Sequence, residues 1–422
     1  MHLLNHCEYD TYLLINPNFF SHFHLSKRKV ASLAKSGIRA KVLTFVEKNL
    51  YRVNQEKYNY YEKSSLVKII IYDKKQTQQL ALLKFTLKEI IKGRKLIFHV
   101  LKFNAASLIV MKKNPYFNNR VKIIHEFEGD PSSEYLYSRV DYEQFRGLKK
   151  LLKKKHQVKA YIKLKTDQFK VKNSDGLIFM SSEQLALWEA RTNKQLNSFI
   201  LPTLPEAGRI KFSSEHRYTI RKNLKLNQKL VIIYIGNVST KWQRLDSMCE
   251  FIFRLGSIFD KICFLCLVPD KDISIAEQAV SKNNIENKSI IKTIAPEDIY
   301  KYLSAADIAL FLRHDHLMNN IVTSGKLGEF LASGLPVIST GANAAILNEF
   351  MIQENLMIKL SDNLSIDECL IESIRLYSEE KDVNINKGTR LSKSYRFQSF
   401  FNIDDKLDKG YTSFIKSFIP DS

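Results

Sequence analysis

The stretch Gly325–Thr340, GKLGEFLASGLPVIST, carries the signals of a helix, its end and a following strand. Thr323–Ser324 just before it are residue types that favour a helix start, and Lys326–Ala332 has the composition of the helix itself. Gly334, followed by a proline two residues later, ends the helix. Val337–Thr340 is short and β-branched, which is typical of a strand covered on both faces in a parallel sheet. The stretch therefore predicts a helix–strand step of an α/β fold.

A glycine inside this helix raises a further question. Gly328 costs roughly 1 kcal/mol relative to alanine in a helix interior, so its presence predicts that something approaches the backbone closely. A bound ligand and a neighbouring helix are both compatible with the sequence.

Helix and strand signals alternate along most of the chain. Tyr12–Asn16, Leu25–Ser36 and Ala40–Phe45 read as a first strand, helix and strand. Alternation of this kind predicts an α/β fold with doubly wound parallel sheets and helices on both faces. Further strands are expected at 67–72, 96–100, 121–125, 176–180, 230–235, 262–268, 290–294, 308–312 and 337–340.

The length and the proline positions predict two domains. A chain of 422 residues exceeds what one hydrophobic core usually serves. The two prolines in Leu201–Pro205 mark the expected boundary, after which the strand pattern restarts. We therefore expect an N-terminal Rossmann-like domain over 8–204, completed by 396–422, and a C-terminal one over 205–395.

Composition indicates a cytoplasmic protein that binds anions. The five cysteines are irregularly spaced, as in a reducing compartment, and no apolar run approaches the ~20 residues that span a bilayer. Cys263 and Cys266 form a lone CxxC inside an apolar run, which favours a buried strand over a zinc site. The net charge of +21 is compatible with nucleic acid, a membrane surface or phosphorylated substrates as partners.

Part of the positive charge lies on one expected amphipathic helix. Its apolar face would carry Phe145, Leu148, Leu151 and Leu152. The flanking lysines would suit an anionic membrane surface, although an ordinary solvated helix has the same pattern. These candidate membrane-surface residues are Lys149, Lys150, Lys153, Lys154 and Lys155.

Two short triplets contain residue types that bind metal ions. Asp270-Lys271-Asp272 has a carboxylate spacing that metal-dependent sugar transferases use, but a solvated charged loop is the better interpretation. His314-Asp315-His316 lacks a visible third ligand. We therefore predict no metal.

Segment Asp298–Thr340 resembles the donor-binding region of GT-B glycosyltransferases of the GT4 type, especially those of bacterial surface polysaccharide synthesis. The resemblance rests on Ala305-Ala306-Asp307, on Arg313 after a strand, and on the block K-x-x-E-F-L-A-x-G-x-P-V-I that begins at Lys326. One departure is that Ile321 stands where the fuller motif has a first glutamate. Weaker similarity extends over most of the chain, including His125-Glu126, the loop after Tyr234 and the C-terminal segment.

The resemblance implies a GT-B architecture, two Rossmann-like domains facing an interdomain cleft, and a set of site residues. Glu329 would accept hydrogen bonds from a ribose, and Lys326 with the helix amides would hold a diphosphate. His125 would act at the reacting sugar, although a histidine satisfied at a strand end remains an equal alternative. The implied donor-binding residues are Gly236, Asn237, Lys241, Arg244, Arg313, Asn320, Ser324, Gly325, Lys326 and Glu329.

The implied activity is retaining, metal-independent transfer of a sugar from a nucleoside-diphosphate donor, without a further cofactor. The acceptor would be a saccharide or lipid-linked saccharide at the inner face of the cell membrane, for capsule or O-antigen synthesis. The alternatives are a non-catalytic subunit of the same fold and a basic nucleic-acid-binding protein. The last lacks any recognisable nucleic-acid-binding motif.

Overall fold

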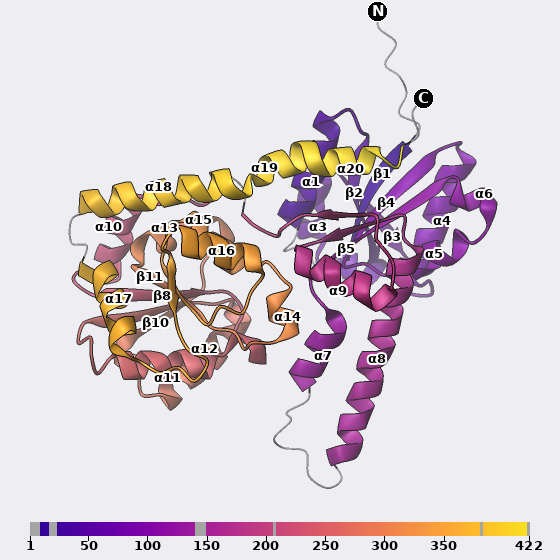
Figure 1. Ribbon diagram of the computed structural model, residues 1–422. Coiled ribbons are helices and arrows are strands. Elements are labelled where there is room, and N and C mark those ends of the chain that lie inside the picture. The colour runs from indigo at the N-terminus through magenta and orange to yellow at the C-terminus, as the bar shows by residue number, and fades with distance from the viewer. Residues whose placement is uncertain (1–8, 17–22, 140–148, 206–207, 380–382, 420–422) are drawn as a thin grey trace, which may run out of the picture. The chain divides into compact units, whose positions relative to one another are not determined.

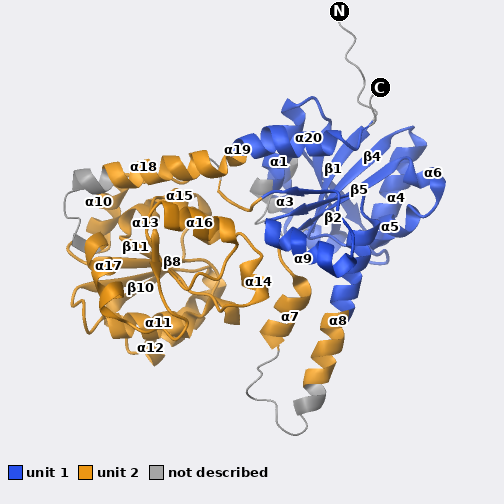
Figure 2. Ribbon diagram, viewed as in Figure 1, with its two compact units in different colours: residues 1–128, 162–201, 404–422 blue, residues 129–161, 202–403 orange. Residues whose placement is uncertain are grey.

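The computed structural model describes residues 9–16, 23–139, 149–205, 208–379 and 383–419. The chain forms two compact units, each described here by itself (Figure 2). Unit 1 comprises 1–128, 162–201 and 404–422, and unit 2 comprises 129–161 and 202–403. The switch from Leu201 to Pro202 falls in the proline-containing segment, whereas residues 129–161 group with unit 2. The domain limits given above stay a prediction.

Unit 1 is built on a seven-stranded, entirely parallel sheet. Its strand order is β3-β2-β1-β4-β5-β6-β7, so the order reverses between β1 and β4 and the connecting helices cover both faces. The strands are β1 Tyr9–Ile15, β2 Ala40–Glu47, β3 Val67–Tyr72, β4 Lys95–Leu101, β5 Val121–Phe127, β6 Gly176–Phe179 and β7 Ser198–Ile200. The helices are α1 Phe23–Lys35, α2 Lys48–Val53, α3 Gln55–Glu62, α4 Gln78–Ile91, α5 Ala106–Met111, α6 Pro115–Asn118, α9 Ser182–Thr192, a π-helical turn Lys406–Tyr411 and α20 Thr412–Lys416.

Unit 2 repeats this plan with six parallel strands in the order β10-β9-β8-β11-β12-β13 (Figure 1). The strands are β8 Leu230–Ile235, β9 Ile262–Leu267, β10 Ser289–Lys292, β11 Ile308–Phe311, β12 Val337–Ser339 and β13 Met357–Lys359. The helices are α7 Pro131–Arg139, α10 Ser214–Asn223, α11 Leu245–Leu255, α12 Ile273–Lys282, α13 Ile299–Ala305, α14 Leu317–Asn320, α15 Gly325–Ala332, α16 Ala345–Gln353, α17 Glu368–Glu379 and α18 Val383–Phe401. Helix α8, Lys149–Asn173, contributes to both units, and the short α19, Ile403–Asp405, spans the switch at 403–404.

The α/β fold class, with two doubly wound sheets, is confirmed. Every expected strand is present within a few residues, but β7 and β13 were not predicted because each has only three residues. Strand β9 is fully buried, so Cys263 and Cys266 are core residues, as predicted. Among the described helices, none combines the length and the apolar character needed to cross a membrane.

Each sheet has its own apolar core. In unit 1 aromatic residues of neighbouring strands and α4 meet, with the rings of Tyr12 and Phe85 in edge contact at 5.2 Å between centroids. In unit 2 β8, β9 and α11 supply a core that includes Ile232, Phe264 and Phe251, all without exposed surface. These cores fix the carboxyl ends of β8 and β11, where the loops of the candidate site begin.

Candidate functional site

The candidate site of unit 2 begins where β8 meets the first turn of α15. Gly236, directly after β8, has φ +104°, and a Cβ there would come within 2.6 Å of Lys326 Cε. Only glycine allows both this backbone conformation and the passage of the lysine. Gly236 therefore makes room for a side chain of the protein.

The glycine inside α15 has the same kind of explanation. A Cβ at Gly328 would lie 2.7 Å from Leu204 Cδ2 and 2.9 Å from Pro205 Cδ. At the helix end, Gly334 has φ +69°, and a Cβ there would collide with the backbone carbonyl of Arg390. The segment that lies against Gly328 is the non-helical Leu204–Pro205, so the expected neighbouring helix was wrong, and the glycine needs no ligand to explain it.

Lys326 is turned back onto the end of β8. Its ammonium donates to the Tyr234 hydroxyl at 2.6 Å, to Gln243 Oε1 at 2.8 Å and to the Asn237 carbonyl at 3.3 Å. Burial, followed by the nearby Arg313, lowers the pKa of Lys326 well below its ordinary value. All three donors are thus occupied by neutral acceptors, so a phosphate would have to replace the long bond to Asn237.

Arg313 is the second buried cation of this site. Its Nη1 donates to the carbonyls of Trp242 at 3.1 Å and Leu312 at 3.2 Å, and its backbone N–H donates to Thr340 Oγ1 at 3.0 Å. Among the described residues neither Arg313 nor Lys326 has a carboxylate within ion-pair distance. Two basic side chains at this depth without a carboxylate in direct contact are unusual, because burial of an unpaired charge is costly.

Arg244 is held differently from Arg313. It lies in the left-handed region with φ +53°, 8% exposed, and its guanidinium bonds the carboxylate of Asp362 and, at 3.0 Å, the Asp362 carbonyl. Its charge is therefore already balanced within the protein. Arg313, which has no carboxylate partner among the described residues, is therefore the stronger candidate for a diphosphate ligand.

Glu329 lies one turn after Lys326 on α15. Burial raises the pKa of its carboxyl to about 7, although Arg209 and Lys326 oppose the shift. The carboxyl has no hydrogen bond or ion pair with any described residue. A part-buried carboxylate without partners is a candidate acceptor for ligand hydroxyls.

The start of α15 leaves backbone donors unused. Ser324 is the N-cap residue, but its side chain makes no capping bond, and Thr323 instead accepts a bond from the N–H of Thr203 at 3.0 Å. The first amides of a helix, here those of Gly325 and Lys326, have no intrahelical partner. They add to the positive potential of this end of the helix.

The loop after β8 is fixed by its own side chains. Asn237 Oδ1 accepts bonds from the N–H of Ser239 at 2.8 Å and its hydroxyl at 2.7 Å, while Lys241 is exposed. Asp272 is 1% exposed and accepts a bond from the N–H of Val238 at 2.9 Å. The interpretation of Asp270–Asp272 as a wholly solvated loop was therefore wrong for Asp272, which stabilises the candidate site.

The remaining polar residues near β11 serve the local structure. Asn320 donates to Asp315 Oδ1 at 2.7 Å, and His316 Nδ1 caps α14 by accepting a bond from the N–H of Met318 at 3.2 Å. Within the described residues, no group of three or more His, Cys, Asp or Glu side chains is placed to hold a metal ion.

Tyr234, Gln243, Asp362 and Thr340 are further members of the site that the sequence did not reveal, because nothing distinguishes them from ordinary strand and loop residues.

His125 lies in unit 1, on β5. It is 4% exposed, its Nδ1 is 2.7 Å from Ser174 Oγ, and Nε2 has no hydrogen-bond partner among the described residues. Burial, with Lys170 and His99 nearby, lowers the pKa of His125 to about 3, so the imidazole is neutral at pH 7. Its catalytic role stays a prediction.

The lysines expected at a membrane surface lie on the first turns of α8. Lys154 and Lys155 are exposed and Lys153 is half-buried. The side chains of Lys149, Lys150, Leu151 and Leu152, like Phe145 and Leu148, lie outside the described part. Further along α8, Val158, Tyr161 and Ile162 are each more than half exposed.

No protein-family model matches this chain, and no curated protein matches it. Among solved structures, Alr3699/HepE of Anabaena in complex with UDP superimposes with TM-score 0.65 at 11% identity, over 97% of this chain and all of the other. Sucrose-phosphate synthase of Thermosynechococcus elongatus gives 0.67 at 13%, over 97% and 99%. WaaG, a glycosyltransferase of lipopolysaccharide biosynthesis, gives 0.59 at 12%, over 98% and 100%. The chain therefore has the GT-B fold.

Proposed function

We propose that this chain is a retaining glycosyltransferase of the GT4 type, which transfers a sugar from a nucleoside diphosphate to a saccharide or lipid-linked saccharide in cell-surface polysaccharide synthesis. The observation that carries the proposal is the pair of buried cations, Lys326 and Arg313, that have only neutral partners. An anionic ligand would supply the missing charge. The neighbours of known structure include one in complex with UDP-glucose.

Different residues of α15 bind the ribose and the diphosphate of the donor. Glu329 accepts hydrogen bonds from the ribose, and the free amides at Gly325 and Lys326 bind the diphosphate. As the bond between sugar and phosphate breaks, negative charge grows on the leaving diphosphate. Lys326 and Arg313 stabilise that charge without a divalent cation or other cofactor. Asn237, Asn320, Lys241 and Arg244 shape the surrounding loops.

The acceptor is proposed to be presented at an anionic membrane surface by way of α8. Its exposed lysines Lys154 and Lys155 and the exposed side chains of Val158, Tyr161 and Ile162 provide the basic and apolar parts of an interfacial helix. In this proposal the protein is peripheral on the inner face of the cell membrane.

Calorimetric titration with UDP, GDP, CDP and dTDP, without added metal, tests the donor site. We expect one nucleotide to bind, and Lys326→Met and Glu329→Ala each to weaken it by at least tenfold, about 1.4 kcal/mol. Lys282→Met and Glu349→Ala change exposed residues of the same unit and serve as matched controls.

Transfer activity separates the enzyme from a non-catalytic subunit. Nucleotide binding together with EDTA-resistant release of the nucleoside diphosphate from the matching donor supports the proposal. Loss of activity in EDTA with rescue by Mn²⁺ would refute metal independence. Binding of none of the four nucleotides would refute the donor site.

A further inference from the structure

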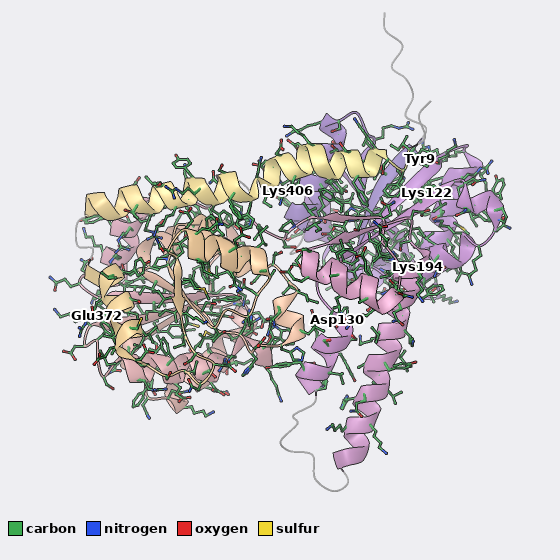
Figure 3. The ribbon with its side chains drawn as sticks, viewed as in Figure 1. Tyr9, Lys122, Asp130, Lys194, Glu372 and Lys406 are labelled. Carbon is green, nitrogen blue, oxygen red and sulfur yellow. The ribbon has the colours of Figure 1, made fainter. Side chains whose placement is uncertain are left out.

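A cationic cavity lies in unit 1, at the amino ends of its central strands. It has a volume of about 550 Å³ and is formed where β1, β2 and β3 begin. Tyr9 and Lys122, labelled in Figure 3, mark this edge at the starts of β1 and β5. Ligands of open parallel sheets bind at the opposite, carboxyl ends, so this cavity is not part of the donor site. Its charged and aromatic lining residues are Asp10, Tyr12, Arg39, Lys41, Lys68 and Arg94.

The carboxylates near this cavity are already shared among three cations. Asp10 accepts Arg39 Nε at 3.0 Å and Arg94 Nη1 at 3.3 Å. Glu89 accepts Arg94 Nη1 at 2.5 Å and Lys92 Nζ at 3.2 Å. Neither carboxylate is left to balance a further positive charge.

Two lysines of the lining remain without an ion pair. Neither Lys41 nor Lys68 forms a hydrogen bond or ion pair with any described residue. The Lys68 ammonium instead lies over aromatic rings, 4.8 Å from the centroid of Phe85 and 5.9 Å from that of Tyr12. Burial, with the positive charges of Lys41, Lys92 and Arg94, lowers the pKa of Lys68 despite the nearby Glu89. The unit therefore concentrates positive charge here and lacks an anion to balance it.

We propose that this cavity binds a phosphorylated ligand, with Lys41 and Lys68 contacting the phosphate. The volume is that of a small-molecule site and is too small for a nucleic-acid surface. Lysine ammonium groups bind phosphate as point charges. The phosphate belongs to either a soluble phosphorylated metabolite or the headgroup of a lipid, and the chemistry of recognition is the same.

Titration of the full-length protein with inorganic pyrophosphate tests this site, in the presence of a saturating concentration of whichever nucleoside diphosphate binds the donor site. The double variant Lys41→Gln/Lys68→Gln should bind pyrophosphate at least tenfold more weakly than wild type. Lys63→Gln/Lys74→Gln changes two exposed lysines of the same unit and should bind like wild type. Because removal of Lys68 relieves repulsion among like charges, the thermal midpoint of the test variant should not fall.

Flotation with phosphatidylglycerol vesicles distinguishes the two sources of phosphate. Pyrophosphate binding that depends on Lys41 and Lys68 supports a soluble ligand, and vesicle binding that depends on the same lysines supports a lipid headgroup. If wild type and double variant bind pyrophosphate equally and vesicles equally, or bind neither, the site does not exist. The difference between wild type and the double variant does not depend on donor binding, because both proteins have the same unit 2.

Discussion

In unit 1 the buried ammonium of Lys29 contacts both oxygens of Glu126, at 2.6 and 2.5 Å, and His99 Nε2 lies 2.8 Å from the same carboxylate. In unit 2 the ammonium of Lys326 reaches only a hydroxyl, an amide oxygen and a carbonyl. Burial alone would raise the pKa of Glu126, yet Lys29 and His99 hold it at about 2. The first arrangement is complete without a ligand. The second lacks negative charge, and this difference separates a structural ion pair from a candidate binding site.

The largest effect is expected when the ion pair between Lys29 and Glu126 is broken. Glu126→Gln should lower the free energy of unfolding of unit 1 by about 3–5 kcal/mol, because Lys29 is left as an uncompensated buried charge. Each unit contains one of the two tryptophans, so Trp188 fluorescence in a Trp242→Phe background follows unit 1 during urea unfolding.

A double variant and the pH dependence sharpen this test. Lys29→Met/Glu126→Gln should recover much of the lost stability, since both charges are gone. The wild type should lose stability as pH falls from about 5 toward 2, because the folded protein holds Glu126 ionised below the pKa of the unfolded chain. If Glu126→Gln unfolds like wild type, the network does not stabilise unit 1.

An intermediate effect is expected at Gly236. Gly236→Ala should destabilise unit 2 by about 1–3 kcal/mol from the backbone conformation and also displace Lys326, so that nucleotide affinity falls. Gly37→Ala is the matched control in unit 1, because Gly37 has φ +79° and a Cβ there would meet no atom within 4 Å. Urea unfolding of Gly236→Ala is followed by Trp242 fluorescence, and that of Gly37→Ala by Trp188 fluorescence. Unchanged nucleotide binding in Gly236→Ala would contradict the crowding of Lys326.

The smallest effect concerns the protonation of Glu329. Because its pKa is raised to about 7, a nucleotide that requires the ionised carboxylate should bind about tenfold more tightly at pH 8 than at pH 6. Calorimetry of Glu329→Gln corrects for the titration of the nucleotide itself and should show a flatter profile. The same shift predicts that Glu329 favours folding below about pH 4.5 and loses that contribution as pH rises through 7. Parallel profiles for both proteins would remove Glu329 from the ribose contact.

Most of the fold could be predicted from the sequence, because strands such as Leu230–Ile235 are apolar throughout and end at turn residues. The motif also led to α15, Lys326 and Glu329. Charge balance could not be predicted, because the ion pair of Arg244 with Asp362 joins residues 118 positions apart. The buried Tyr234 and Gln243 carry no local signal of contact with Lys326, and Gly328 needed the position of Leu204 to be explained.

The packing around α15 limits which of its residues can change during evolution. Gly328 and Gly334 each lie against protein atoms that leave no space for a side chain. The Arg390 guanidinium meanwhile donates to backbone carbonyls at the ends of α13 and α15, those of Leu303, Ser304, Ala306 and Ser333. Mutation at these glycines is therefore expected to disrupt folding whether or not a reaction is catalysed. A descendant that had lost its activity would therefore keep the glycines of the motif while Glu329 drifted, and Glu329 is the more informative position for recognising an active member.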